Sequence, residues 1–146
     1  MKRPTWTITW VDEMSVGITE IDEDHKRFIL LIHEFNRSIT DRMTPSEIKN
    51  RLQIIIDDAE RHFKLEEKLF KEWKYPDTEA HANTHTKVLN ELKVIVDEFV
   101  PYGHDSSWVD AGLRVKTLLI NHILLEDMMY ARFYQKSRNA AIAENA

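Results

Sequence analysis

The fold is decided by one stretch, residues 44–73, which reads TPSEIKNRLQIIIDDAERHFKLEEKLFKEW. Its opening, Thr44-Pro45-Ser46-Glu47, is a capping box with proline at the first helical position. A stripe of residues, meaning positions that share one face of the helix, then follows at alternating spacings of four and three. This spacing is typical of the buried face of a helix in a bundle. The stripe residues are Ile48, Leu52, Ile55, Ala59, His62, Glu66, Leu69 and Trp73. Two ionisable residues, His62 and Glu66, therefore stand where apolar side chains are expected.

Three further segments carry a stripe with the same spacing. The stripes read Ile21, His25, Phe28, Ile32, Phe35 and Ile39; His81, His85, Val88, Leu92, Ile95 and Phe99; and Ala111, Val115, Leu118, His122, Leu125 and Met129. The pattern predicts helices over about 20–41, 45–74, 77–99 and from Ser106 or Ser107 to about 136. Because the connections are short, we expect an all-α, antiparallel up-down-up-down four-helix bundle. We expect one domain over 1–146, with an irregular arm over 1–19 and a frayed tail over about 137–146.

Composition excludes several classes of protein. Three glycines and four prolines favour long helices over a turn-rich β architecture. A net charge of −5 without a basic stripe argues against a nucleic-acid partner. No apolar run is long enough to span a membrane and no signal core follows the first residues, so we expect a cytoplasmic protein without membrane insertion. The chain has no cysteine, which excludes thiolate ligands and Fe–S clusters and leaves iron, manganese or zinc held by nitrogen and oxygen.

Seven ionisable residues form a candidate ligand set for two metal ions. They are His25, His62, Glu66, His81, His85, His122 and Asp127. Burying a polar group without a partner costs about 1–3 kcal/mol. Five such histidines and a glutamate would use up most of a typical stability of about 5–15 kcal/mol. Metal ions would compensate, and a bridging carboxylate suits two ions roughly 3.5–4 Å apart.

The last ligand pair does not fit a regular helix. His122 and Asp127 are five residues apart, which is about 140° around an α-helix. Glu126, four residues after His122, is the better partner from spacing alone. Either Glu126 is the ligand, or the helix contains a local π-type bulge, a feature that tends to occur at functional sites.

The complete ligand set resembles that of the hemerythrin family, and of bacteriohemerythrins in particular. It reads His25, His62-x-x-x-Glu66, His81-x-x-x-His85 and His122-x-x-x-x-Asp127, and the resemblance covers about residues 6–134. Flanking residues agree, including Trp10, Val16-Gly17-Ile18, Phe63 and Tyr130. The resemblance favours Asp127 over Glu126. It implies a non-haem di-iron centre with an oxo or hydroxo bridge that binds O2 reversibly.

Carried over to this chain, the resemblance implies an asymmetric centre. His81, His85 and His122 would hold a coordinatively full iron, and His25 and His62 an iron with an open position. Glu66 and Asp127 would bridge the two ions, and O2 would rest as hydroperoxide at the five-coordinate iron. Side chains expected to line the O2 pocket are Phe28, Phe63, Leu119 and Ile123.

We therefore expect a bacterial oxygen carrier or store, which delivers O2 to an unknown recipient, rather than an enzyme, with no catalytic residues. Ferritin-like oxidases use Glu-x-x-His motifs, and no glutamate lies three residues before a histidine here. Two alternatives remain: an oxygen or redox sensor module, and a di-iron enzyme that handles peroxide or NO. Asp22 is expected to start the first helix rather than to contact an imidazole.

Overall fold

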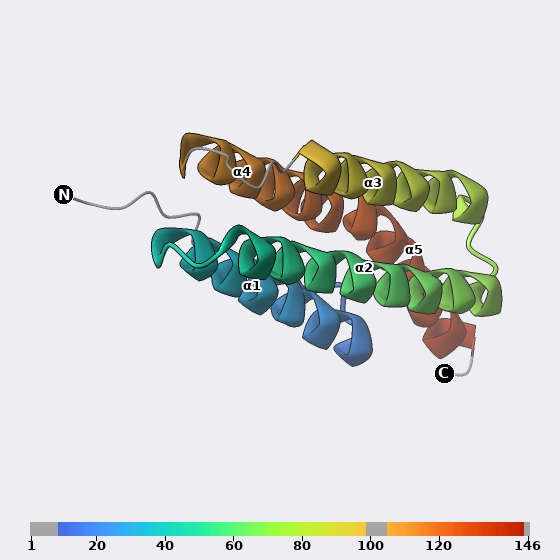
Figure 1. The fold of residues 1–146 in the computed structure, drawn as a ribbon. Coiled ribbons are helices and arrows are strands. Elements are labelled where there is room, and N and C mark those ends of the chain that lie inside the picture. The colour runs from blue at the N-terminus through green and yellow to red at the C-terminus, as the bar shows by residue number, and fades with distance from the viewer. Residues whose placement is uncertain (1–8, 99–104, 145–146) are drawn as a thin grey trace.

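All regular structure in the described part of the chain, residues 9–98 and 105–144, is helical in the computed structural model. A 3-10 turn, η1 (Asp12–Met14), precedes α1 (Thr19–Thr40), α2 (Pro45–Trp73) and α3 (Thr78–Glu98). The last helical rod joins α4 (Asp105–Asn121), the π-helix η2 (His122–Glu126) and α5 (Asp127–Glu144) without a break (Figure 1). The predicted all-α class is confirmed for these residues.

The capping box at the start of α2 forms as the sequence predicts. The Thr44 hydroxyl accepts a hydrogen bond from the Glu47 amide at 3.2 Å, and Pro45 occupies the first helical position. The helix ends at Trp73, and the left-handed backbone of its C-cap, Lys74 (φ 56°), turns the chain toward α3. Local chemistry thus fixes both ends of the helix that carries His62 and Glu66.

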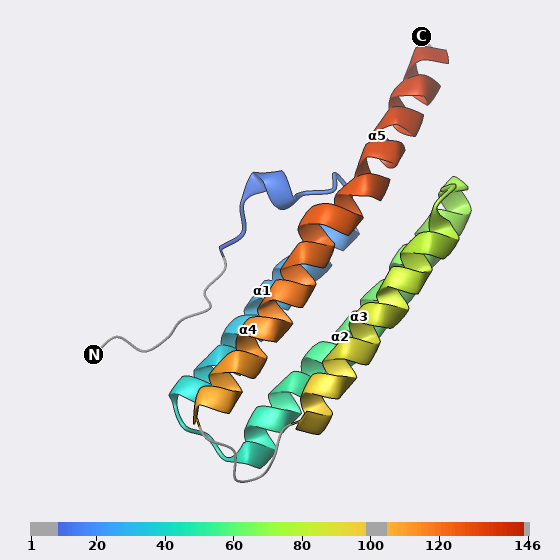
Figure 2. The same cartoon turned by 90° about the horizontal axis from the view of Figure 1, so that it is seen from above.

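The helices α1 to α4 each lie beside two of the others. α1 contacts α2 and α4, and α3 contacts the same two helices, so the helices surround a common interior (Figure 2). Two apolar clusters fill that interior. The larger includes Phe28, Phe63 and Leu119, and the smaller includes Ile21, Phe70 and Tyr130. His25 lies between residues of the two clusters on α1, as Glu66 does on α2 and as His122 and Asp127 do on the last helical rod. No helix in the described ranges is long and apolar enough to cross a membrane.

The predicted stripes of the first three helices are buried or partly buried wherever they are described, but the fourth stripe is wrong in its second half. Leu125 and Met129 are 63% and 55% exposed. The π-helix inserts one residue into the turn after His122, so every later position rotates away from the predicted face. The buried positions beyond it are Asp127, Tyr130 and Ala131.

Two predicted boundaries also differ. α4 starts at Asp105, just before the predicted serine caps, and α5 continues to Glu144 where the sequence predicts a frayed tail. The three alanines at positions 140, 141 and 143 favour helix even without packing, which accounts for the longer helix. The first eight residues of the predicted arm, and Phe99 of the third stripe, lie outside the described residues.

Candidate metal centre

The seven predicted residues converge at one buried place. Two groups of side chains form, and within each group one ligand atom per residue lies within 4.8 Å of all the others. Glu66, His81, His85, His122 and Asp127 make up the first group, and His25, His62, Glu66 and Asp127 the second. We call these the three-histidine half and the two-histidine half. Both halves share Glu66 and Asp127, as expected of two ions bridged by carboxylates.

The π-helix is what brings Asp127 into the centre. Its amide donates a hydrogen bond to the carbonyl of His122, which closes a turn one residue wider than that of an α-helix. As a result, both side chains point inward, and the His122 Nε2 lies 3.0 Å from the Asp127 Oδ1. Glu126 is only partly buried and belongs to neither group. Of the two alternatives that spacing left open, the bulge is the one that forms.

Most of the facing atoms do not form ordinary hydrogen bonds. The His25 Nε2 lies 2.9 Å from the Asp127 Oδ2, and the Nε2 atoms of His62 and His85 lie 3.3 and 3.2 Å from the Glu66 Oε1. Even so, four of the five Nε2 atoms and both Glu66 oxygens have no hydrogen-bond partner among the described residues. Buried polar atoms are rarely left in this state. Their lone pairs converge as metal ligands do, so the donor set fits a pair of metal ions.

Electrostatics also require positive charge at this place. Glu66 and Asp127 are fully buried. Burial and the charge of Asp127 oppose ionisation of Glu66, but His62 and His85 outweigh them and lower its pKa to about 2. In the same way, burial opposes the charge on His62, but Glu66 and Asp24 raise its pKa to about 10. Without metal, protons on imidazoles therefore supply the charge that balances the two carboxylates.

Two carboxylates that sequence reasoning missed contact the outer nitrogens of the imidazoles. Asp24 Oδ2 lies 2.8 Å from the Nδ1 of His62, and Glu67 Oε2 lies 3.4 Å from the Nδ1 of His85. Both carboxylates adjoin a ligand candidate in the sequence, but each contacts an imidazole on a different helix. The spacing of residues along one helix therefore cannot predict these contacts. Asp22 lies in the first turn of α1, as expected, and accepts hydrogen bonds from Ser15 and Val16 of the arm.

Aromatic and aliphatic side chains enclose the centre. Phe28 meets the His62 ring edge-on at 5.3 Å, and Phe63 stacks on the His85 ring at 3.9 Å. Leu119 is 2% exposed in the same apolar cluster. The side chain of Ile123, the fourth predicted lining residue, lies outside the described residues. These walls keep water from the buried ligand atoms.

Comparison with known proteins agrees with this geometry. The family model described as Hemerythrin HHE cation binding domain matches residues 16–134. The chain belongs to the hemerythrin family. It is 29% identical over 124 residues to a hemerythrin-like protein of Naegleria gruberi, which covers 83% of this chain and 88% of that protein. It is 27% identical over 126 residues to a bacteriohemerythrin of Methylococcus capsulatus, covering 86% and 92% of the two chains.

A bacteriohemerythrin of Stenotrophomonas maltophilia is also similar, at 27% identity over 124 residues, covering 85% of this chain and 79% of that protein. The predicted family is thereby confirmed. A hemerythrin domain implies iron binding, and the buried cluster of histidine, glutamate and aspartate can hold metal.

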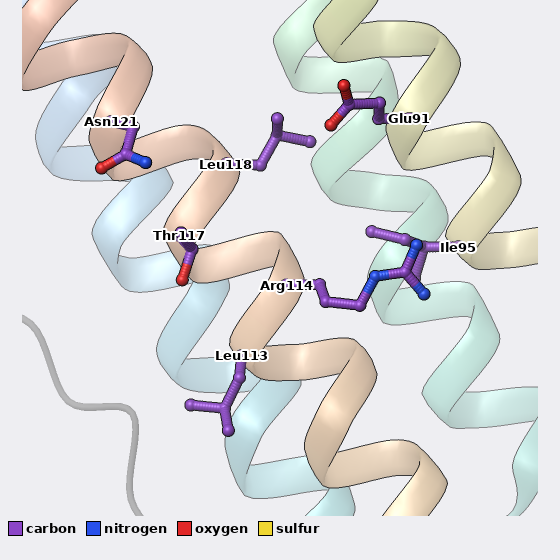
Figure 3. A pocket seen from close by; sticks show the side chains of 7 residues that line it. All are labelled: Glu91, Ile95, Leu113, Arg114, Thr117, Leu118 and Asn121. Atoms are coloured by element: carbon purple, nitrogen blue, oxygen red, sulfur yellow. The ribbon is translucent and has the colours of Figure 1, made fainter.

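The hemerythrin chain also has a surface groove of about 400 Å³ between α3 and α4 (Figure 3). It is lined by Glu91, Ile95, Leu113, Arg114, Thr117, Leu118 and Asn121. Arg114, on one wall, pairs with Glu98 of α3. None of the seven converging residues lines the groove, so it is separate from the metal centre.

Proposed function

We propose that this hemerythrin-family chain binds O2 reversibly at a carboxylate-bridged non-haem di-iron centre and serves as a bacterial oxygen carrier or store. The observation that carries the proposal is the pair of ligand groups, three histidines and two histidines, that share Glu66 and Asp127. An asymmetric donor set leaves one ion with fewer protein ligands, and such an ion keeps a position for an external ligand.

In this proposal, His81, His85 and His122 would hold the coordinatively full iron, and His25 and His62 would hold the iron with the open position. Glu66 and Asp127 would be shared by the two ions, and an oxo or hydroxo group would complete the di-iron centre. The bound iron pair supplies the two electrons that reversible O2 binding requires. The seven buried side chains support this assignment because they offer only nitrogen and oxygen donors, which suit iron.

The apolar walls make the binding reversible. Phe28, Phe63, Leu119 and Ile123 line the O2 pocket in this proposal and present no group that can donate a proton to the ligand. Exclusion of water slows proton leakage and so favours release of O2 over irreversible oxidation of the iron pair. The burial of Phe28, Phe63 and Leu119 supports this role.

A second candidate function, a di-iron enzyme that handles peroxide or NO, is favoured by one observation. The Tyr130 hydroxyl is buried, with no hydrogen-bond partner in the described part of the chain. Burial, and then the negative charges of Asp127 and Glu66, raise the pKa of Tyr130 well above its usual range. Tyr130 therefore keeps its proton at neutral pH and offers a hydroxyl donor close to the carboxylates, a kind of group that the apolar lining residues lack.

The proposal extends to the setting of the site. We propose that the chain forms one domain with up-down-up-down helices, as the contacts of α1 and α3 with both α2 and α4 support. We also place it in the cytoplasm, with O2 as ligand and with an oxygen-consuming protein as recipient.

The test is an optical spectrum of the anaerobically reduced, iron-loaded chain through repeated cycles of air and vacuum. We expect a visible charge-transfer band that appears in air and disappears under vacuum over many cycles. A band that forms once and decays to a ferric spectrum would contradict reversible binding. Steady consumption of peroxide or NO, abolished by Tyr130→Phe, would instead support the enzyme.

A further inference from the structure

The two halves of the centre differ in how many imidazoles they contribute. Both use Glu66 and Asp127, but one adds three histidines and the other only His25 and His62. Affinity for a metal ion rises with the number of well-oriented donors, so the two-histidine half is the weaker half by ligand count. Its occupancy therefore depends on how well its two imidazoles are held. This reasoning rests on the proposed di-metal site.

Only one of those two imidazoles has a hydrogen bond on Nδ1, the ring nitrogen that faces away from the centre, among the described residues. The Nδ1 of His62 donates to the Asp24 Oδ2 at 2.8 Å, a short, charge-assisted hydrogen bond. The Nδ1 of His25 has no hydrogen-bond partner among the described residues. In the neutral ring, a proton fixed on Nδ1 leaves the lone pair of the His62 Nε2 free and directed at the centre. An outer carboxylate fixes the tautomer and orientation of a metal-binding imidazole in this way.

Asp24 is itself fixed by a chain of ion pairs between α1 and α2. Its Oδ1 accepts a hydrogen bond from the Arg61 Nη2 at 2.8 Å. Arg61 also contacts Asp58 at 3.2 Å, and the Nε of Arg27 contacts the same Asp58 oxygen at 3.2 Å. The Asp24 side chain is only 15% exposed, so solvent screens its contact with His62 weakly. Asp24 is thus oriented before a metal ion arrives.

The three-histidine half has a weaker outer contact. Glu67 lies 3.4 Å from the Nδ1 of His85, beyond the usual hydrogen-bond length, and its side chain is 35% exposed. The half with more imidazoles thus has the looser outer partner, and the half with fewer has the tighter one. This contrast indicates that the outer carboxylates matter unequally for the two ions.

We propose that Asp24 is a positioning residue that sets the metal affinity of the two-histidine half, so that the second ion is held tightly only while Asp24 orients His62. Asp24 does not contact the ion. It acts through the tautomer and the ring orientation of His62.

The test is an anaerobic titration of the metal-free full-length chain with Fe²⁺, and in parallel with Co²⁺ as a spectroscopic probe. We expect two ions per wild-type chain. In Asp24→Ala we expect one tight ion and a second weakened about 10–100-fold, the usual effect of removing an outer partner of a ligand. Asp24→Asn, which keeps an acceptor oxygen but loses the charge, should lie between them and carries the test if the alanine variant does not fold.

A double-variant comparison separates positioning from general damage. His62→Ala should lose the same ion, and its one-ion Co²⁺ spectrum should match that of Asp24→Ala. Asp24→Ala added to His62→Ala should have no further effect on metal binding, because Asp24 acts only through that ring. A further loss in the double variant would overturn the proposal, as would a second ion of unchanged affinity in Asp24→Ala.

The controls are two other acidic residues. Asp22, on the same helix, makes two hydrogen bonds to the arm. Asp22→Ala should therefore lower the thermal midpoint of the metal-free chain without weakening the second ion. Glu67→Ala should leave the affinity of the two-histidine half unchanged, and loss of the same ion in Glu67→Ala would overturn the proposal. A wild-type chain that binds fewer than two ions would instead refute the proposed di-iron function.

Discussion

Deletion of Leu125 tests the interpretation of η2 as an α-helix with one extra residue. Leu125 is 63% exposed and lies inside the five-residue π segment. Removing it would place Asp127 four residues after His122, where a regular α-helix puts both side chains on one face. Since residues before and after the bulge keep their positions, both halves of the centre should survive. We expect two metal ions per chain, as in the wild type.

The deletion should also stabilise the metal-free chain. A π turn interrupts the regular i→i−4 ladder, and restoring one net backbone hydrogen bond is worth about 1 kcal/mol. For a chain of this size, that corresponds to a rise in thermal midpoint of roughly 2–4 °C. Metal content by elemental analysis and the midpoint by calorimetry, with and without chelator, measure the two effects.

The matched control is deletion of Leu113, another exposed leucine, in the regular helix α4. That deletion rotates all preceding positions by about 100° relative to His122 and should unfold the chain or abolish metal binding. A Leu125 deletion that folds but loses an ion would refute our account of the bulge, because it would show that the wider turn itself is needed for the ligand geometry.

Three further predictions concern the metal and the arm. Chelation of the loaded chain should lower its thermal midpoint by roughly 8–16 °C, because an ion at 1,000 times its Kd contributes about 4 kcal/mol; calorimetry that finds equal midpoints would contradict a buried metal centre. Metal binding at pH 7 should release at least one proton, because the pKa of His62 is raised to about 10 in the metal-free chain and the ion takes the neutral imidazole. A pH indicator in weak buffer measures this release, and its absence would show that His62 is neutral before binding. Gly17→Ala should lower the free energy of unfolding by about 1–2 kcal/mol, since Gly17 has a φ of +78°. The Gln135 amide beside it can move aside, so an unchanged urea midpoint would mean that the arm adjusts its backbone.

The helices and their inward faces could be predicted because they depend on local chemistry. The Thr44 cap, Pro45 and the 4-3 spacing of apolar residues act within a few turns of one helix, and the first three stripes are buried or partly buried in the structure wherever they are described. A metal centre could be predicted for a related reason, because a buried imidazole or carboxylate needs a partner and six of the seven candidates stand at stripe positions. The family, and with it the choice of Asp127, came from the resemblance of the whole ligand motif to hemerythrins.

The exposed positions of Leu125 and Met129 could not be predicted from the same rule. Periodicity assumes 3.6 residues per turn throughout, and one inserted residue breaks that phase for the rest of the rod. The five-residue spacing between His122 and Asp127 was the only sign of the inserted residue in the sequence. That spacing also allowed Glu126, in place of Asp127, as the ligand on a regular helix.

The helical class and the candidate ligand types could thus be predicted from the chain alone, because they follow from periodicity and from the chemistry of single side chains, whereas the family followed from the resemblance of the complete ligand motif to hemerythrins. The tertiary structure decided which atoms meet. Asp24 reaches His62 across 38 residues, and Glu67 reaches His85 across 18. Such contacts depend on how two helices are rotated against each other, and that rotation is set by the packing of the whole interior rather than by any local pattern.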